Sequence, residues 1–220
     1  MTYALVPVKD LSKAKERLSP ILSIGERTIL AYAMLEDVLR ALKSSRNLKK
    51  LFVITLDESA IELANSMDIE VIREETQESE SGSVDNGSSI CKDLGAESVL
   101  VIPGDAPLIT SDDVDFILER EIPFPSIILV PSRDELGTNA ILRRPPDIIP
   151  SRFGYDSFRK HISEAEKEHI PYYIYNLPRV ALDIDEPRDL ALFSSRESDT
   201  KTYRELLSIG VIQKVSKIIN

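Results

Sequence analysis

Apolar and polar positions alternate along this chain in blocks that are typical of an α/β protein. Short apolar runs of strand length occur at residues 3–8, 51–55, 69–72, 98–102 and 126–130. Longer stretches with helical spacing of apolar residues lie between these runs, and the clearest covers residues 24–42. Strands that alternate with helices in this way predict a mostly parallel sheet covered by helices.

The second half of the pattern is less regular. Further strands are expected at residues 138–142, 172–175 and 180–182, and a further helix at residues 157–168. Pro187 suits the first turn of another helix, because proline lacks an N–H that is unpaired there anyway. We therefore expect a three-layer α/β/α sandwich with a mostly parallel sheet that is mixed at one edge.

Polar residues indicate where several helices begin. Asp57 is a suitable N-cap for the helix that follows it, and Thr110 with Asp113 resembles a capping box. Residues 74–83 are acidic, rich in serine and without periodicity, which predicts a mobile surface loop. The next helix is expected to begin near Asn86.

The C-terminal segment is unusually apolar for a tail. We expect one domain over residues 1–195 and a helical tail over residues 196–220. The apolar positions of the tail are Leu206, Leu207, Ile209, Val211, Ile212, Val215, Ile218 and Ile219. Because such a surface is unfavourable in water, we expect it to cover the core or a second subunit, and we predict a homodimer.

Composition excludes several classes of partner. A formal net charge of −10 argues against nucleic acid or an anionic membrane as a partner of the whole surface. The single cysteine, Cys91, cannot form an intrachain disulfide. Since no apolar run resembles a signal peptide or reaches membrane-spanning length, we expect a cytoplasmic protein that binds small molecules.

Common nucleotide-binding and hydrolase motifs are absent from the sequence. The chain contains neither G-x-x-x-x-G-K-[ST] nor G-x-G-x-x-G, which disfavours a P-loop ATPase and a dinucleotide-binding dehydrogenase. It also lacks H-E-x-x-H and G-x-S-x-G. Candidate chemistry therefore has to come from residues that are spread along the chain.

A cationic loop follows the first predicted strand, and a lone carboxylate follows a later one. The basic residues of the loop are Lys9, Lys13, Lys15 and Arg17, and the carboxylate is Asp105. In an open α/β sheet both positions are expected beyond the carboxyl ends of strands, where ligands bind. A triphosphate needs cationic groups and an acidic ligand for its metal ion, so nucleotide chemistry is the leading hypothesis. A solvated loop and a helix cap are the alternatives.

Two further carboxylates complete a candidate metal site. Asp183 and Asp185 lie two residues apart, so on an extended segment they share one face while Ile184 points the other way. Paired carboxylates repel each other unless they are solvated or bridged by a cation. Because magnesium is commonly held by one or two carboxylates and phosphate oxygens, it is the cofactor that we expect.

Hydroxyl residues beside glycines suggest an anion site. Thr138 follows Gly137, and Ser157 lies close to Gly154 at the start of a predicted helix. Hydroxyls and backbone N–H groups there suit a phosphate or a carboxylate, although turn and cap chemistry explains the same residues. His161 lies one turn into this helix and is either a further anion contact or a structural histidine.

Taken in order, these motifs resemble the CofC family. The similar segments are V-P-V-K (6–9), A-K-E-R-L (14–18), M-L-E-D-V-L (34–39), P-G-D-A-P-L (103–108), G-T-N-A (137–140), G-Y-D-S-F (154–158) with His161, and D-I-D-E-P-R-D-L (183–190). The resemblance implies a nucleotidyltransferase fold similar to that of the molybdenum-cofactor guanylyltransferases, which is GT-A/MobA-like. It also implies transfer of GMP from GTP to 2-phospho-L-lactate in coenzyme F420 biosynthesis, giving lactyl-2-diphospho-5'-guanosine and pyrophosphate.

The resemblance implies roles for individual residues as well. The residues expected to hold the GTP phosphates are Lys9, Lys15 and Arg17. These three, together with Asp105, are also expected to act in catalysis. The residue expected near the nucleoside is Asn86, and those expected to hold the phosphorylated acid are Thr138, Gly154 and Ser157. The residues expected to bind magnesium are Asp105, Asp183 and Asp185. Two positions depart from the family pattern, since relatives usually carry leucine at Asp85 and glycine at Leu136.

Other functions stay open at this point. The acceptor could be phosphoenolpyruvate or 3-phosphoglycerate, which relatives also use. A sugar-phosphate or molybdopterin nucleotidyltransferase could use the same architecture. A non-catalytic reading is a nucleotide-binding regulatory domain whose acidic clusters are merely solvated.

Overall fold

Seven strands form one sheet at the centre of the computed structural model, which describes residues 1–219 and the side chains of residues 1–215. The strands are β1 (Thr2–Pro7), β2 (Lys50–Thr55), β3 (Glu70–Arg73), β4 (Ser98–Val101), β5 (Ser126–Pro131), β6 (Thr138–Arg144) and β7 (Tyr172–Ile174). Their order across the sheet is β3-β2-β1-β4-β6-β5-β7. β6 is antiparallel to both of its neighbours and the other pairs are parallel, so the predicted mostly parallel mixed sheet is confirmed. The reversed strand lies inside the sheet rather than at its edge.

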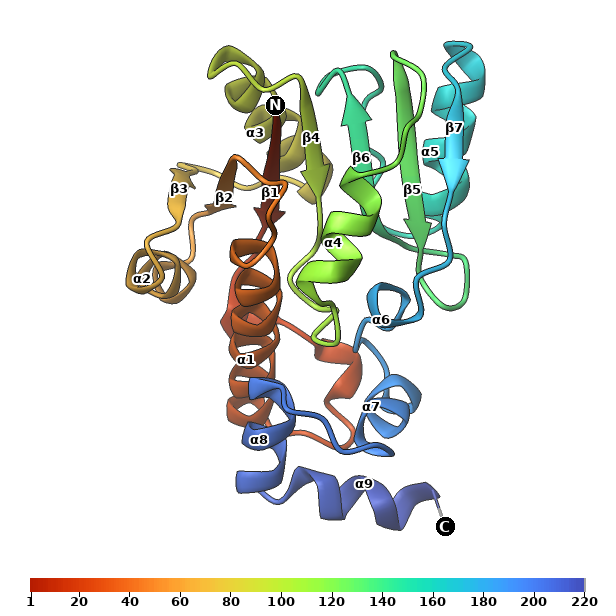
Figure 1. Ribbon diagram of the computed structural model, residues 1–220. Coiled ribbons are helices and arrows are strands. Elements are labelled where there is room, and N and C mark those ends of the chain that lie inside the picture. Colours follow the sequence, from red (N-terminus) through yellow and green to blue (C-terminus); the bar gives the residue numbers. More distant parts are fainter. Residues whose placement is uncertain (220) are drawn as a thin grey trace.

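Helices cover both faces of the sheet, which confirms the three-layer sandwich (Figure 1). One face carries α1 (Ile24–Lys43), α2 (Glu58–Ser66) and α4 (Ser111–Leu118). The other face carries α3 (Glu80–Asp93) and α5 (Ser157–Lys167). Alternation along β1 explains the division: Ala4 and Val6 pack under α1, whereas Tyr3 and Leu5 pack under α3.

The C-terminal helices lie beyond one end of the sheet (Figure 1). These helices are α6 (Pro178–Ala181), α7 (Pro187–Ser194), α8 (Lys201–Ser208) and α9 (Val211–Ile219). α8 packs on α1, and α9 packs on α7 and α8. Leu206 and Val211 join Leu30 and Met34 of α1 in a third apolar cluster.

The tail therefore packs on helices of its own chain. The predicted homodimer stays a prediction, and the side chains of Ile218 and Ile219 lie outside those that the structure describes. Within residues 1–219, no helix combines the length and the apolar character that crossing a bilayer requires.

Asp37 of α1 fixes the start of α8. Its Oδ1 accepts a hydrogen bond from the backbone N of Lys201 at 2.7 Å. Its Oδ2 accepts from the backbone N and the hydroxyl of Thr202, at 2.8 and 2.7 Å. Burial raises the pKa of Asp37 although these bonds favour the charged form. Because the first N–H groups of a helix have no partner within the helix, this distant carboxylate acts as an additional cap.

Two expected helix starts are confirmed. The Asp57 side chain accepts from the backbone N of Ala60 at 2.9 Å and caps α2. Thr110 and Asp113 form the reciprocal bonds of a capping box at the start of α4. Aspartate thus replaces the usual glutamate without loss of the motif.

The expected loop over residues 74–83 was partly wrong. α3 begins at Glu80, where the hydroxyl of Ser79 caps it by accepting from the backbone N of Gly82 at 3.0 Å. Asn86 consequently lies inside the helix rather than at its start. The face of α3 toward the sheet is built from small residues, and a Cβ at Gly87 would come within 2.8 Å of the Leu5 side chain. Small residues that pack closely do not produce a periodic pattern of apolar positions. The sequence therefore gave no sign of the part of the helix before Asn86.

The expected strand at residues 180–182 was also wrong. These residues belong largely to α6, which has Pro178 in its first turn. Proline fixes φ near the helical value, and Val180 packs into the core beside the sheet instead of extending it. Tertiary packing here overrides the strand preference of a β-branched residue.

Replacing Asp37 with alanine should lower the free energy of unfolding by about 1–3 kcal/mol, because three donors at the start of α8 would lose their acceptor. Urea denaturation followed by circular dichroism measures the change. Glu197→Ala is a suitable control, since it removes an exposed carboxylate from the segment before α8. Equal stability of Asp37→Ala and the control would show that this cap is unimportant.

Candidate active site

Most of the predicted site residues lie at the edge of the sheet where the parallel strands end. β1 and β4 are adjacent and parallel, so the cationic loop after β1 and Asp105 after β4 leave the sheet side by side. The backbone N of Ile184 donates to the backbone O of Asp105 at 3.1 Å and brings the third segment to the same place. Ile184 itself is buried in the third apolar cluster, so its two neighbouring aspartates can face the site.

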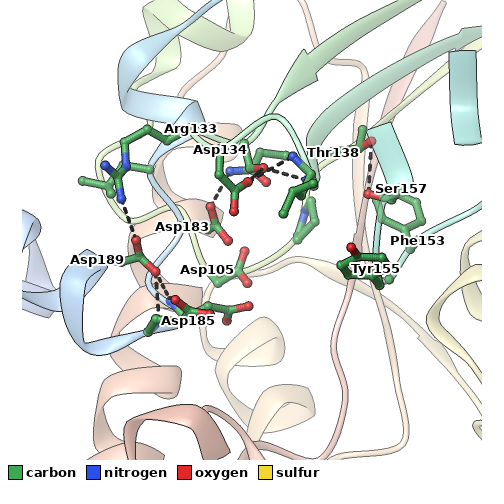
Figure 2. A pocket seen from close by; sticks show the side chains of 18 of the residues that line it. Asp105, Arg133, Asp134, Thr138, Phe153, Tyr155, Ser157, Asp183, Asp185 and Asp189 are labelled. Atoms are coloured by element: carbon green, nitrogen blue, oxygen red, sulfur yellow. Dashed lines mark hydrogen bonds and ion pairs between the residues drawn. The ribbon is translucent and has the colours of Figure 1, made fainter. Parts of the chain in front are cut away.

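Three carboxylates converge at this edge. Asp105, Asp183 and Asp185 each offer one oxygen, and these oxygens all lie within 4.8 Å of one another. Figure 2 shows the three side chains reaching into one shared space, with Ser157 and Tyr155 across from them. The structure thus brings together the three residues that the sequence predicts as metal ligands, from two separate segments of the chain.

The ammonium group of Lys15 lies between two of the carboxylates. Its Nζ donates to Oδ2 of Asp105 at 2.9 Å and to Oδ1 of Asp185 at 2.6 Å, and the side chain is only 8% exposed. Burial alone would lower the pKa of Lys15, but the two aspartates raise it above its ordinary value. Likewise burial would raise the pKa of Asp185, but Lys15 lowers it. Lys15 is therefore a permanent cation at the centre of the site.

A left-handed backbone conformation places Lys15 there. Its φ is 57°, between the short 3₁₀ turns η1 (Leu11–Lys13) and η2 (Glu16–Leu18). The turns are anchored by Leu11 and Leu18, which are buried on either side. A lysine rarely adopts positive φ without compensation, and its two ion pairs supply that compensation.

Asp183 differs from the other two aspartates in its surroundings. Its Oδ1 accepts from the Asn139 amide at 3.0 Å, and the same amide donates to the carbonyl of Val180 at 2.9 Å. Burial, together with the charge of Asp105, raises the pKa of Asp183 to about 7. A carboxylate held in this way beside two others favours a bound cation, and the hard oxygen donors of the cluster fit magnesium.

Two pockets meet at the carboxylates. One has a volume of about 420 Å³ and is lined by Thr138, Gly154 and Ser157. The other has a volume of about 600 Å³ and is lined by Lys9, Lys13 and Lys15 together with residues 77–80, which lead into α3. Asp105 and Asp185 line both pockets. The arrangement therefore has a compartment with three lysines, here called the basic pocket for those side chains, and a hydroxyl-lined compartment, on either side of one acidic centre.

Lys9 and Arg17 are less enclosed than Lys15. Nζ of Lys9 lies 3.4 Å from Oε2 of Glu80, and a guanidinium N of Arg17 lies 3.6 Å from Oε1 of Glu186. Arg17 is 66% exposed and lines the smaller pocket, whereas Lys9 lines the larger one. Such loose ion pairs can exchange their carboxylate for a phosphate at little cost.

The smaller pocket depends on the reversed strand. Because β6 is antiparallel to β4, its first residue, Thr138, lies at the edge where β4 ends. Gly154 has a φ of 107°, a conformation that strains any residue with a side chain. Its carbonyl accepts from the backbone N of Ser157 at 3.2 Å, which closes the turn before α5. Leu136 stands where the family resemblance leads us to expect glycine. Its carbonyl accepts from the backbone N of Phe158 at 3.3 Å, so the loop before β6 is bonded to the first turn of α5.

Asn86 is the one predicted site residue that the structure does not bring to either pocket. It lies on the exposed side of α3 and lines neither compartment.

Glu80 is a site residue that the sequence analysis missed, because it assigned residues 74–83 to a surface loop. It lines both pockets. Burial and nearby Asp105 raise the pKa of Glu80, although Lys9 opposes the shift. Serine followed by an acidic residue at Ser79 and Glu80 is a helix N-terminus signal that could have located it.

Comparison with known proteins identifies the family. The family described as "Guanylyl transferase CofC like" matches residues 2–218. A phosphoenolpyruvate guanylyltransferase of Conexibacter woesei is 34% identical over 212 residues, which cover 94% of this chain and 95% of that protein. A 2-phospho-L-lactate guanylyltransferase of Methanocaldococcus jannaschii is 31% identical over 208 residues, covering 94% and 88%.

Solved structures agree on the fold. A nucleotidyl transferase from Methanothermobacter thermautotrophicus superposes with a TM-score of 0.63 at 14% identity, covering 88% of this chain and 95% of that one. At this identity the likeness concerns the α/β nucleotidyltransferase fold alone. The family match over nearly the whole chain, together with this fold, leads to one conclusion: the protein is an enzyme of the CofC-like guanylyl transferase family.

Proposed function

We propose that this enzyme transfers GMP from GTP to 2-phospho-L-lactate, giving lactyl-2-diphospho-5'-guanosine and pyrophosphate, as a step of coenzyme F420 biosynthesis. The observation that carries the proposal is the acidic centre of Asp105, Asp183 and Asp185 at the junction of two pockets. The basic pocket suits a nucleoside triphosphate, and the hydroxyl-lined pocket suits a small phosphorylated acid. The Methanocaldococcus relative carries the name 2-phospho-L-lactate guanylyltransferase, which supports this acceptor.

The reaction joins two anions, so positioning and charge are the main tasks of the protein. An oxygen of the acceptor phosphate forms a bond to the α-phosphorus of GTP, and the bond from the α-phosphorus to the bridging oxygen of pyrophosphate breaks. The acceptor phosphate has a second pKa of about 6 and is largely dianionic at neutral pH, so it needs no general base. Preorganised cations and in-line placement supply most of the acceleration in such transfers.

Different residues would bind GTP, magnesium and the phosphorylated acid. Lys9 and Lys15 face the basic pocket and would neutralise the phosphates of GTP, while Arg17 reaches the acceptor side. Asp105, Asp183 and Asp185 are the residues that would hold magnesium, which when bound offsets the charge of both reacting phosphates. Thr138, Gly154 and Ser157 would hold the acid through hydroxyls and backbone N–H groups.

Phosphoenolpyruvate is the second candidate acceptor. The Conexibacter relative, at 34% identity, carries the name phosphoenolpyruvate guanylyltransferase. Phosphoenolpyruvate and phospholactate share a phosphate beside a carboxylate and differ at one carbon centre. The polar groups of the smaller pocket therefore suit both molecules.

Incubation of the enzyme with GTP, magnesium and each acid in turn tests the acceptor. We expect the highest kcat/KM with 2-phospho-L-lactate, and mass spectrometry identifies the guanylated product. 3-Phosphoglycerate and mannose 1-phosphate are the comparison substrates. A higher kcat/KM with phosphoenolpyruvate would select the second candidate, whereas GTP binding without turnover of any acid would overturn the proposed class of acceptor.

Asp105→Asn should fold normally while pyrophosphate release falls by at least about 10²-fold, because the acidic centre loses one of the two carboxylates that face both pockets. A coupled pyrophosphate assay measures the rate, and circular dichroism checks the fold. Asp112→Asn is the matched control, since Asp112 is an exposed carboxylate of α4 that lines neither pocket. A folded Asp105→Asn protein with the activity of the control would remove Asp105 from the mechanism.

Asp183→Asn should weaken magnesium binding at least about tenfold, because a neutral amide replaces one of the charged ligands. Isothermal titration calorimetry with magnesium chloride in the absence of substrates gives the affinity directly. Asp134→Asn is the matched control, since Asp134 lines the smaller pocket outside the three-aspartate cluster. Equal affinities of the two variants would place the ion elsewhere.

A further inference from the structure

His161 is a buried histidine that the proposed reaction does not use. It lies on α5, is 0% exposed, and its ring meets the edge of Phe153 at a centroid distance of 5.2 Å. Both of its ring nitrogens have partners: Nε2 contacts the backbone N of Arg152 at 2.9 Å, and Nδ1 contacts the hydroxyl of Thr138 at 3.0 Å. One of these partners, Thr138, therefore lines the smaller pocket, to which the proposed function assigns the acceptor.

The backbone partner determines where the ring carries its proton. A backbone N–H can only donate, so Nε2 must accept from Arg152 and cannot carry a hydrogen. The neutral ring then has its single proton on Nδ1, which must donate to Oγ1 of Thr138. The geometry thus fixes both the tautomer of His161 and the direction of its bond to Thr138.

The same reasoning fixes the role of the Thr138 hydroxyl. Oγ1 of Thr138 accepts from His161 and also from the hydroxyl of Ser157 at 3.3 Å, so both of its lone pairs are engaged. Its own hydrogen has no acceptor among the described residues. Thr138 is 3% exposed and lines the smaller pocket, so a ligand that reaches its hydroxyl there would be the acceptor for that hydrogen.

A buried network holds His161 in this state. The guanidinium of Arg143, which is 1% exposed, donates to Asp85 and to the hydroxyl of Ser151, both at 3.0 Å. Asp85 in turn accepts from the backbone N of Ser151 at 3.1 Å, which fixes the chain just before Arg152. Burial, followed by the charge of Arg143, lowers the pKa of His161 to about 4, against the opposing effect of Asp85.

Accepting two hydrogen bonds makes a hydroxyl a stronger donor, because each bond polarises the next. A strong, fixed donor favours an ionised oxygen, since hydrogen bonds to charged acceptors are about twice as strong as neutral ones. A substrate that offered only a neutral hydroxyl to Thr138 would form a weaker hydrogen bond there.

We propose that His161 is a positioning residue that makes the Thr138 hydroxyl an obligatory donor to an anionic oxygen of the acceptor, and so contributes to selection of a phosphorylated acid. The proposal rests on the proposed function for the identity of that acceptor. It assigns no chemistry to the imidazole itself. His161 acts through Thr138, and its contribution is to acceptor binding rather than to GTP binding.

Two substitutions of His161 separate this role from simple packing. His161→Asn keeps an amide donor near the position of Nδ1, whereas His161→Gln can accept from Arg152 near the position of Nε2 but offers Thr138 no donor. We expect Gln to raise the KM of the acceptor about tenfold and Asn to raise it less than about threefold, with the KM of GTP unchanged in both. Equal effects of the two variants, or parallel changes in both KM values, would overturn the proposal. Thermal melts establish that each variant is folded.

A double-mutant cycle tests whether His161 acts through Thr138. In a Thr138→Val background, His161→Gln should leave the affinity for the acceptor unchanged, because the hydroxyl that it orients is gone. Calorimetric titration of the apo protein with phosphoenolpyruvate provides that affinity without turnover. A further tenfold loss in the double variant would overturn the proposal.

The tautomer itself can be measured independently of any reaction. Two-dimensional ¹⁵N–¹H spectra of protein labelled at histidine should show His161 protonated at Nδ1 and unprotonated at Nε2 at pH 7. The opposite tautomer or a charged ring would overturn the proposal even if GMP transfer occurs. Conversely, the expected tautomer in a protein that transfers GMP to no acid would contradict the proposed function and leave the orientation of Thr138 supported.

Discussion

The interaction on which the site depends is the double ion pair of Lys15 with Asp105 and Asp185. Three carboxylates brought within a few ångströms repel one another strongly, and burial increases the repulsion because little water is present to screen it. The single positive charge of the Lys15 ammonium is shared by two of these carboxylates, while the Asn139 amide holds the third carboxylate through a hydrogen bond. The backbone bond between Ile184 and Asp105 then locks the two acidic segments together. The three carboxylates can therefore lie together in the folded chain before any ligand arrives.

The reversal of one strand gives this centre its second compartment. In a fully parallel sheet, every strand would begin at the far edge, and residues at the start of a strand could not reach the site. β6 runs the other way, so Thr138 at its start lies at the edge of the sheet where β1 and β4 end, beside the end of β4. The basic pocket belongs to the parallel half of the sheet, and the hydroxyl-lined pocket belongs to the mixed half. Two compartments thus open onto the same carboxylates from different sides.

Support for the hydroxyl-lined pocket comes from a network of buried polar residues. Arg143 is fully buried, and its charge is satisfied by Asp85, Ser88 and the carbonyl of Ile149. Breaking such a buried pair is costly because it leaves an uncompensated charge. Asp85, which departs from the leucine expected from the family resemblance, is thereby explained as the partner of this arginine. The network ends at Arg152 and His161, directly behind Thr138.

The sequence by itself determined the features that follow local rules. Alternating apolar residues fixed the strands and layers, side chains of Asp57, Thr110 and Asp113 marked helix starts, and the residue types at Asp105, Asp183 and Asp185 indicated an acidic cation site. Tertiary structure decided which residues meet. It placed Asn86 away from both pockets and Glu80 within them, turned residues near Val180 into a helix, and paired Lys15 with carboxylates 90 and 170 positions away. The reason is physical: periodicity and capping act over a few residues, whereas ion pairs, tautomers and pocket walls depend on distances that only the packed chain creates.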